Sequence, residues 1–490
     1  MNNNKVKFIL LFLVGVGLSF SACKDYLDVN IDPNQSTTSR IDLQLSSAEL
    51  QISIGMGQRM FPNLAIWSQY WTGGPGVSLG DPDQHKLASS EGNELFRTLY
   101  RSNVNLDFII KNSTENYYVG IAKILKAYNF QVLADLFGDI PYIEALNGDI
   151  PDGSILHPHY DSAKDVVYPG IEAELLDAIR LIEATGSFQV PGTDDLIYGG
   201  NMDNWDKFAH TLLLKIYLRQ GASGQAKANA LYTSDDQFII TNDEMGAIAF
   251  PGGSSASNPF WNAAKSTALG NYYVATTTVL DYLTATQDPR IDAFFDRAPS
   301  GVHIGEYPGD IQNAGPTATF SRPNGALAAA GGIIFGPTKP VILISAWEGN
   351  LLLSEAKARG WIAGDAEPNY EDGVYASFEY LGLPDSLATN YLAGVGGAFD
   401  VANPIRSIAL QKWTSMNGLQ PIEAWIETRR FDTPSDHIFF GPGGLFKSPT
   451  KNALGVDIFP SILPYPENEE SLNQSFPGQH QITDKVFWDN

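Results

Sequence analysis

A regular apolar stripe runs through the segment between Tyr118 and Leu136. Its members recur at steps of three and four residues, the spacing that places side chains on one side of an α-helix. The pattern stops in the octapeptide DLFGDIPY (Asp135–Tyr142), where Gly138 can adopt a positive φ and Pro141 cannot continue a helix. The sequence therefore predicts a buried helix whose apolar positions are Ile121, Ile124, Leu125, Tyr128, Val132 and Leu136.

Similar stripes follow along the chain and alternate with segments rich in Gly, Pro, Ser and Asn. His159–Ile179 predicts a helix with Asp161 as its N-cap, and Ile197–Gln220 predicts one preceded by a glycine-rich turn. Long loops in a compact body are usually functional, so we expect binding residues in about 62–91 and 237–340. Five tryptophans lie within helical patterns and are predicted to belong to the core: Trp205, Trp347, Trp361, Trp413 and Trp425.

The amino-terminal segment has the layout of a lipoprotein signal peptide. Lys5 and Lys7 precede a 13-residue apolar stretch, Phe8–Phe20, and small residues then lead to Cys23, the single cysteine of the chain. The stretch is shorter than the roughly 18 residues that a membrane-spanning helix needs. We expect cleavage after residue 22 and acylation of Cys23, with residues 23–40 as a tether and 41–490 as one domain.

Charge and motifs exclude several classes of function. The formal net charge is −24, and cleavage would remove Lys5 and Lys7 to leave −26 (−24 − 2), so nucleic-acid phosphate would be repelled. The chain contains no HExxH zinc motif, GxSxG elbow, Walker loop or GxGxxG before a helix. The sequence therefore predicts a binding protein rather than an enzyme, although a pair of carboxylates for a glycosidase cannot be recognised from sequence alone.

Several motifs in sequence order resemble the SusD/RagB family of nutrient-binding outer-membrane lipoproteins, specifically its SusD-like second branch. They begin with CKDYLDVNIDPN at Cys23 and DLFGDIPY at Asp135, and they span nearly the whole chain. The others are HYDSAKDVVYPGIEAELLDAI (159–179), IYGGNMDNWDKFAHTLLLKIYLRQ (197–220), DPRIDAFFD (288–296), LLLSEAKARGW (351–361), YEDGVYASFEYLG (370–382), IALQKW (408–413), EAWIETRRFDTP (423–434) and FPSILPYPENEESLN (459–473).

The resemblance implies a mostly α fold in which tetratricopeptide-like helical hairpins, in about 92–220 and 340–430, form a scaffold. Long irregular loops and a few short strands would carry the binding face. It also implies a surface-exposed protein, lipid-anchored in the outer membrane, that acts as the lid of a SusC-like TonB-dependent transporter. The ligand would be an oligosaccharide or polysaccharide. A peptide ligand and a lipid-anchored glycoside hydrolase remain alternatives.

Two aromatic clusters in the predicted loops suit a sugar, because rings stack on its C–H faces while amides bind its hydroxyls. The first contains Trp67, Tyr70 and Trp71, which a helix would place on one side. The second contains Asn258, Trp261, Asn271, Tyr272 and Tyr273.

No cofactor is predicted, and calcium is the one alternative that the sequence raises. Asp28, Asn30, Asp32 and Asn34 imitate the first half of an EF-hand loop. Counted from Asp28, position 6 of the loop is Pro33 rather than Gly, and position 12 is Ser39 rather than Glu, so the segment does not match an EF-hand loop.

Overall fold

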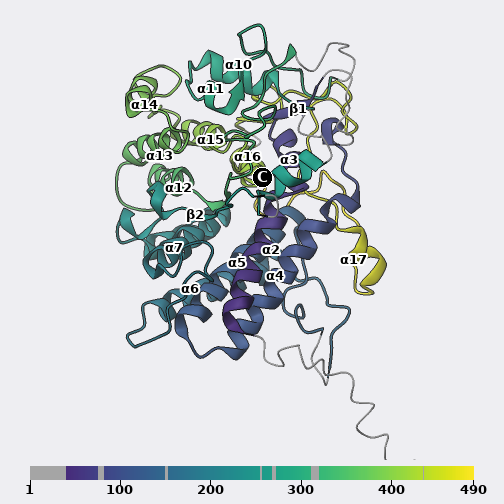
Figure 1. Ribbon diagram of the computed structural model, residues 1–490, viewed down its shortest axis with the longest axis vertical. Helices are drawn as coiled ribbons and strands as arrows, with labels where there is room; N and C mark the ends of the chain where they lie inside the picture. Colours follow the sequence, from purple (N-terminus) through teal and green to yellow (C-terminus); the bar gives the residue numbers. More distant parts are fainter. Residues whose placement is uncertain are drawn as a thin grey trace, which may run out of the picture.

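The computed structural model describes residues 40–74, 82–148, 153–253, 256–266, 272–310, 319–433 and 435–489. Most of the secondary structure is helical, and the helices stack as a curved series of antiparallel hairpins, seen on the left of Figure 1. The prediction of a mostly α fold built from helical hairpins is confirmed. The elements of the first half are α2 (Ile41–Gly57), α3 (Met60–Trp67), β1 (Trp71–Gly73), α4 (Asn93–Asn112), α5 (Asn116–Phe137), α6 (Tyr168–Ile182), α7 (Met202–Arg219), α8 (Gln225–Leu231), β2 (Gly246–Ile248) and α9 (Pro259–Ser266).

In the second half, short helices and strands precede a further group of stacked helices. Each helix of the scaffold packs on its neighbour, α4 on α5, α5 on α6, α6 on α7, α7 on α12 and α12 on α13 and α15. These elements are β3 (Tyr273–Ala275), α10 (Thr277–Ala285), α11 (Ile291–Phe294), β4 (Phe295–Asp296), β5 (Arg322–Pro323), β6 (Val341–Ile344), α12 (Ala346–Ala358), α13 (Ala366–Tyr380), α14 (Asp385–Leu392), α15 (Pro404–Ser415), α16 (Pro421–Phe431) and α17 (Glu467–Leu472).

The strands of the described residues form three two-stranded antiparallel pairs, β1 with β3, β2 with β6, and β4 with β5. In the first pair Trp71 lies opposite Ala275 and Gly73 opposite Tyr273. Segments that are 200 residues apart in the sequence are thereby joined beside the helical stack. The expected loops thus contain short helices and strands.

The ends of the helices follow local signals, with one correction. Gly138 ends α5 with φ of 77°, as predicted from its freedom to adopt positive φ. Asp161 was predicted to cap the next helix, and this is wrong. Its Oδ2 accepts hydrogen bonds from the backbone N–H groups of Tyr142 and Ile143 at 3.0 and 2.8 Å, and Ser162 caps the π-helical turn that leads into α6.

The apolar stripes lie in the interior as predicted. Ile121, Ile124 and Leu125 of α5 are completely buried, and so are Trp205, Phe208 and Leu212 of α7. Of the five tryptophans predicted to belong to the core, Trp361 follows α12 and stays partly exposed, whereas the other four are buried: Trp205, Trp347, Trp413 and Trp425.

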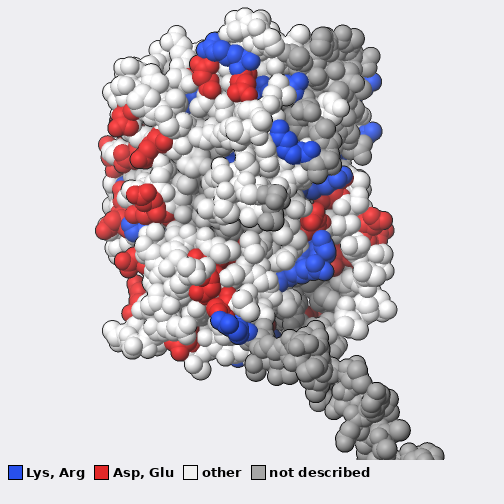
Figure 2. All heavy atoms as spheres, in the orientation of Figure 1, with Lys and Arg blue, Asp and Glu red and all other residues white. Residues whose placement is uncertain are grey.

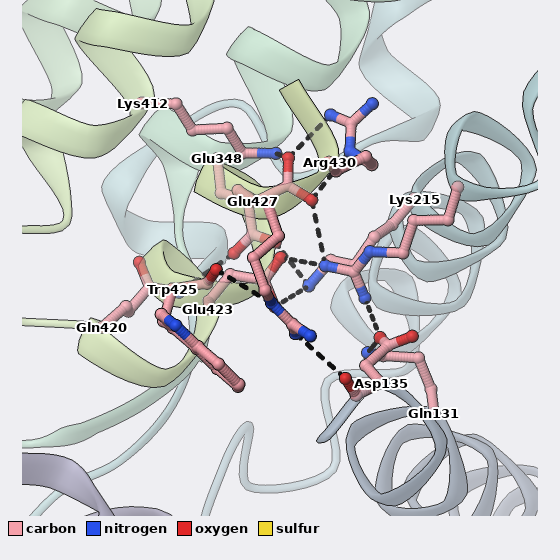
Figure 3. A network of polar contacts seen from close by, with 12 residues as sticks. Gln131, Asp135, Lys215, Glu348, Lys412, Gln420, Glu423, Trp425, Glu427 and Arg430 are labelled. Carbon is pink, nitrogen blue, oxygen red and sulfur yellow. Dashed lines mark hydrogen bonds and ion pairs between the residues drawn. The ribbon is translucent and has the colours of Figure 1, made fainter. Parts of the chain in front are cut away.

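A buried network of charged side chains ties the hairpins together where α5, α7, α12 and α16 meet (Figure 3). Arg219 at the end of α7 pairs with Asp135 of α5 and with Glu423 and Glu427 of α16. Its Nη2 lies 3.1 Å from Oε1 of Glu427. Three helices of separate hairpins therefore converge on one guanidinium group.

The network continues along α16 toward α12. Arg430 donates hydrogen bonds to Glu355 at 2.7 and 2.6 Å and to Glu427 at 2.7 Å, and Lys412 donates to Glu427 at 2.7 Å. Burial alone would raise the pKa of the Glu355 carboxyl, but the guanidinium groups of Arg430 and Arg359 lower it to about 2. These carboxylates stay ionised across the physiological range.

Candidate ligand-binding face

An aromatic cluster lies at the β1–β3 pair and at the start of α9. The ring centroids of Trp71 and Phe260 are 5.8 Å apart and stacked, and those of Trp71 and Tyr273 are 5.6 Å apart. The ring centroid of Phe61, on α3, is 6.0 Å from that of Trp71 and 5.1 Å from that of Phe260. The strand pair brings residues near 71 and 273 to this place, which is why aromatic residues far apart in the chain form one cluster.

The first predicted aromatic cluster does not share one helical face. Helix α3 ends at Trp67, and Gln69 adopts φ of 56°, so Trp71 begins a strand instead. Trp67 and Tyr70 are buried. The indole N–H of Trp67 donates to the carbonyl of Pro82 at 3.1 Å, and the ring of Tyr70 stacks on Trp413 at 5.3 Å. In this conformation neither ring offers a face to a ligand.

Trp71, Tyr273 and Asn258 are buried as well and support the cluster from within. The side chain of Asn258 accepts hydrogen bonds from the backbone N–H groups of Phe260 and Trp261 at 2.9 and 3.1 Å, and donates to the carbonyl of Lys339 at 2.8 Å. Asn258 thereby fixes the start of α9 and the direction of Trp261.

Trp261 and Tyr272 are the two predicted residues that remain partly exposed, and they flank the buried cluster. Asn271 and Cys23 lie outside the described residues. The indole of Trp261 rests on Phe335, with centroids 5.2 Å apart, and Nζ of Lys265 lies 4.5 Å from its ring centre. Sequence reasoning missed both neighbours, although Lys265 stands four residues after Trp261 on a helix, a spacing that brings side chains together.

Phe335 is held in place by a tight loop that follows β5. Asn324 Oδ1 accepts from the backbone N–H of Ile333 at 3.0 Å, and Asn324 Nδ2 donates to Asp296 at 2.9 Å. Gly325 has φ of 86°, and a side chain there would collide with the backbone of Gly332. The loop therefore forms a fixed back wall for Trp261.

The accessible part of the site consists of two partly exposed rings, Trp261 and Tyr272, with the ammonium group of Lys265 over the first. Hollows of about 290 and 360 Å³ exist elsewhere, one between α10 and α14 and the other beside the end of α16, and they are lined by other residues. Partly exposed rings that line neither hollow suit a chain-like ligand better than a small enclosed molecule. Within the described ranges, no group of three or more His, Cys, Asp or Glu side chains could hold a metal ion.

A buried lysine lies below the cluster. Nζ of Lys339 donates to the carbonyl of Gly418 at 2.7 Å and lies 4.0 Å from the ring centre of Phe61, and no described carboxylate acts on its pKa. Burial lowers the pKa of this ammonium group to about 7.

This pKa predicts a dependence of stability on pH. Between about pH 7 and 10 the unfolded chain keeps the proton of Lys339 while the folded protein loses it, because the ordinary pKa is 10.5. Raising the pH through this window should therefore stabilise the parent relative to Lys339→Met, by up to about 1.4 kcal/mol per pH unit. Urea denaturation of both proteins at several pH values measures this difference. A difference that does not change with pH would contradict the prediction.

The chain is similar to known proteins in sequence and in structure. Residues 33–444 match the profile of the SusD-like family described as "Starch-binding associating with outer membrane". The chain belongs to this SusD-like family. This confirms the resemblance that the motifs indicated. A comparison with curated proteins found no match.

Solved structures share the fold of this SusD-like protein. A chitin-binding protein is 23% identical with a TM-score of 0.76, and the match covers 92% of this chain and 100% of that chain. A SusD homolog from Bacteroides fragilis is 21% identical with a TM-score of 0.74, covering 91% and 99%. A chitin-binding SusD homolog from Flavobacterium johnsoniae is 20% identical with a TM-score of 0.72, covering 91% and 98%.

Like the sequence, the structure offers no membrane-crossing segment in its described part. No helix there combines the length and the apolar character that a span requires.

Proposed function

We propose that this SusD-like protein binds an oligosaccharide or polysaccharide at the cell surface, where acylated Cys23 anchors it in the outer membrane. Its ligand would lie across Trp261 and Tyr272. The observation that carries the proposal is the partly exposed indole of Trp261, which Phe335 supports at 5.2 Å and Lys265 at 4.5 Å. A rigidly held aromatic face with polar neighbours is what stacking on a sugar ring requires.

The family description and two relatives support the ligand class. The family is described as starch-binding, and two similar structures are described as chitin-binding. We further propose that the protein is the lid of a SusC-like TonB-dependent transporter, as its family membership suggests. In that role it holds its ligand without changing it chemically. The ligand would shift the lid toward its closed position because it binds the closed complex more tightly than the open one.

Replacing the stacking ring tests the site. Covering one face of the indole removes about 80 Å² from water, worth about 2 kcal/mol at 25 cal/mol/Å², so Trp261→Ala should weaken glycan binding roughly thirtyfold. The measurement is a calorimetric titration with a panel of soluble glucans, chitin oligosaccharides and peptides.

Trp361→Ala is the matched control, because Trp361 is also partly exposed and lies beside a cation, Arg359, at the end of α12. It should leave the affinity unchanged. Equal losses in both variants would contradict the site. Binding of peptides alone would contradict the ligand class, and turnover of a glycan by the purified parent would favour a hydrolase.

A further inference from the structure

Helix α2 exposes an apolar stripe to solvent. Leu43, Leu50 and Ile54 stand at the steps of three and four that mark one side of a helix, and Ser47 lies between them. Leu43 is 61% exposed and Leu50 is 44% exposed, while Ile54 is partly exposed. The glycan site does not use this stripe, since it lies on a different helix.

Helix α4 carries a matching stripe of mixed character. Arg97, Arg101, Val104 and Phe108 follow the same spacing along its outer side. Both arginines are exposed, Val104 is 50% exposed and Phe108 is partly exposed. The stripe is therefore cationic at one end and apolar at the other.

The two stripes lie side by side and form one surface. Helices α2 and α4 pack antiparallel, with Nδ2 of Asn105 donating to Oγ of Ser47 at 3.0 Å, and with Gly55 close to Thr98 and Leu99 (Figure 1). We call this surface the α2–α4 face and define it by the following residues: Leu43, Leu50, Ile54, Arg97, Arg101, Val104 and Phe108.

The charge of the α2–α4 face is opposite to that of the protein as a whole. Arg97 has a distant partner in Glu94 at 3.6 Å, and Arg101 forms no ion pair or hydrogen bond with any described residue. The nearby Asp107 pairs instead with Lys111 and Lys126. Figure 2 shows basic side chains over α4 beside an uncharged stretch of α2, on a chain whose formal net charge is −24.

We propose that the α2–α4 face lies against the anionic lipid headgroups of the membrane. Exposed apolar side chains next to arginines are the pattern of helices that lie on an anionic membrane surface. The proposal rests on the proposed anchoring, because α2 follows directly after the tether. Cys23 is 17 residues before Arg40, so an anchor there lies at most about 60 Å from the start of this face. Tethering makes even a weak surface contact effective by raising the local concentration of lipid.

The test uses chains that begin at residue 24, so that its outcome does not depend on acylation. Such a chain has no cysteine, and Val104→Cys therefore creates a unique site for a nitroxide spin label. The measurement is the collision rate of the spin label with oxygen, which enters lipid, and with a nickel complex, which stays in water. Both rates are compared with and without vesicles of phosphatidylglycerol or phosphatidylcholine. A label at Val395→Cys, a fully exposed position after α14, is the control.

We expect the label at position 104 to gain oxygen collisions and lose nickel collisions with phosphatidylglycerol vesicles, while the label at 395 stays in water. No change at 104, or equal changes at both positions, would overturn the proposal. Immobilisation of the label at 104 without lipid, increasing with protein concentration, would also overturn it, because the face would then bind a second copy. None of these failures would affect the proposed anchor or glycan site.

Charge reversal provides a second measurement. Each arginine near an anionic surface contributes about fivefold to the partition constant, so Arg97→Glu with Arg101→Glu should lower the vesicle partition constant by at least about 25-fold. The control is Arg180→Glu with Arg297→Glu, two exposed arginines on other elements, which changes the net charge equally. Equal losses in both double variants would mean that net charge alone governs binding, and would overturn the proposal.

Discussion

Replacing Arg219 by methionine should lower the free energy of unfolding by about 3–5 kcal/mol, because it leaves the buried carboxylate of Asp135 without its cation and removes one of the cations that Glu423 and Glu427 share. The guanidinium group of Arg219 is completely buried between Asp135, Glu423 and Glu427. Because methionine fills a volume similar to that of arginine, the lost free energy of unfolding comes from the removed charge rather than from a cavity. Urea denaturation followed by circular dichroism measures the effect.

The matched control is Arg180→Met on α6. Arg180 pairs with Asp177 on the surface, where its side chain is 68% exposed. An ion pair in solvent contributes at most about 1 kcal/mol, so this variant should be nearly as stable as the parent. Equal effects of the two substitutions would contradict the structural role that we assign to the buried network.

Replacing Cys23 by alanine should move the protein from the membrane fraction to the soluble fraction. If Cys23 is acylated as predicted, three acyl chains would contribute on the order of forty CH₂ groups at about 0.8 kcal/mol each, far more than any contact of the α2–α4 face. Fractionation of cells followed by immunodetection measures the change, and mass spectrometry of the parent should show the acyl groups on Cys23.

A conservative control separates lipidation from secretion. Ser19→Ala lies in the same apolar segment before the predicted cleavage site and leaves the cysteine intact, so that variant should remain with the membrane. If the Cys23→Ala protein is exported and still sediments completely with membranes, the lipid anchor is wrong.

Local patterns in the sequence predicted the helices well. The stripe in α5 and its end at Gly138 depend on residues within a few positions of each other, so they could be read directly. The motif around Asp135 was recognised only as a mark of the family and the end of a helix. Its role in the charged network could not be predicted, because Arg219 is 84 residues away and Glu423 lies a further 204 residues along the chain.

The candidate site was only partly predictable for the same reason. Trp71 and Trp261 both follow an aromatic residue and precede a polar one, Thr72 and Asn262, so their immediate neighbours do not distinguish them. The structure buries Trp71 because Phe61 and Phe260 pack against it, whereas Trp261 contacts Phe335 and Lys265 and stays partly exposed. Exposure was decided by partners on other elements.

The most direct test of a glycan site on the Trp261 face is a crystal structure with the oligosaccharide that binds most tightly in solution. We expect density for a sugar ring parallel to the indole of Trp261, with further rings extending toward Tyr272. Density for the ligand only in another part of the protein, with the Trp261 face empty, would contradict it.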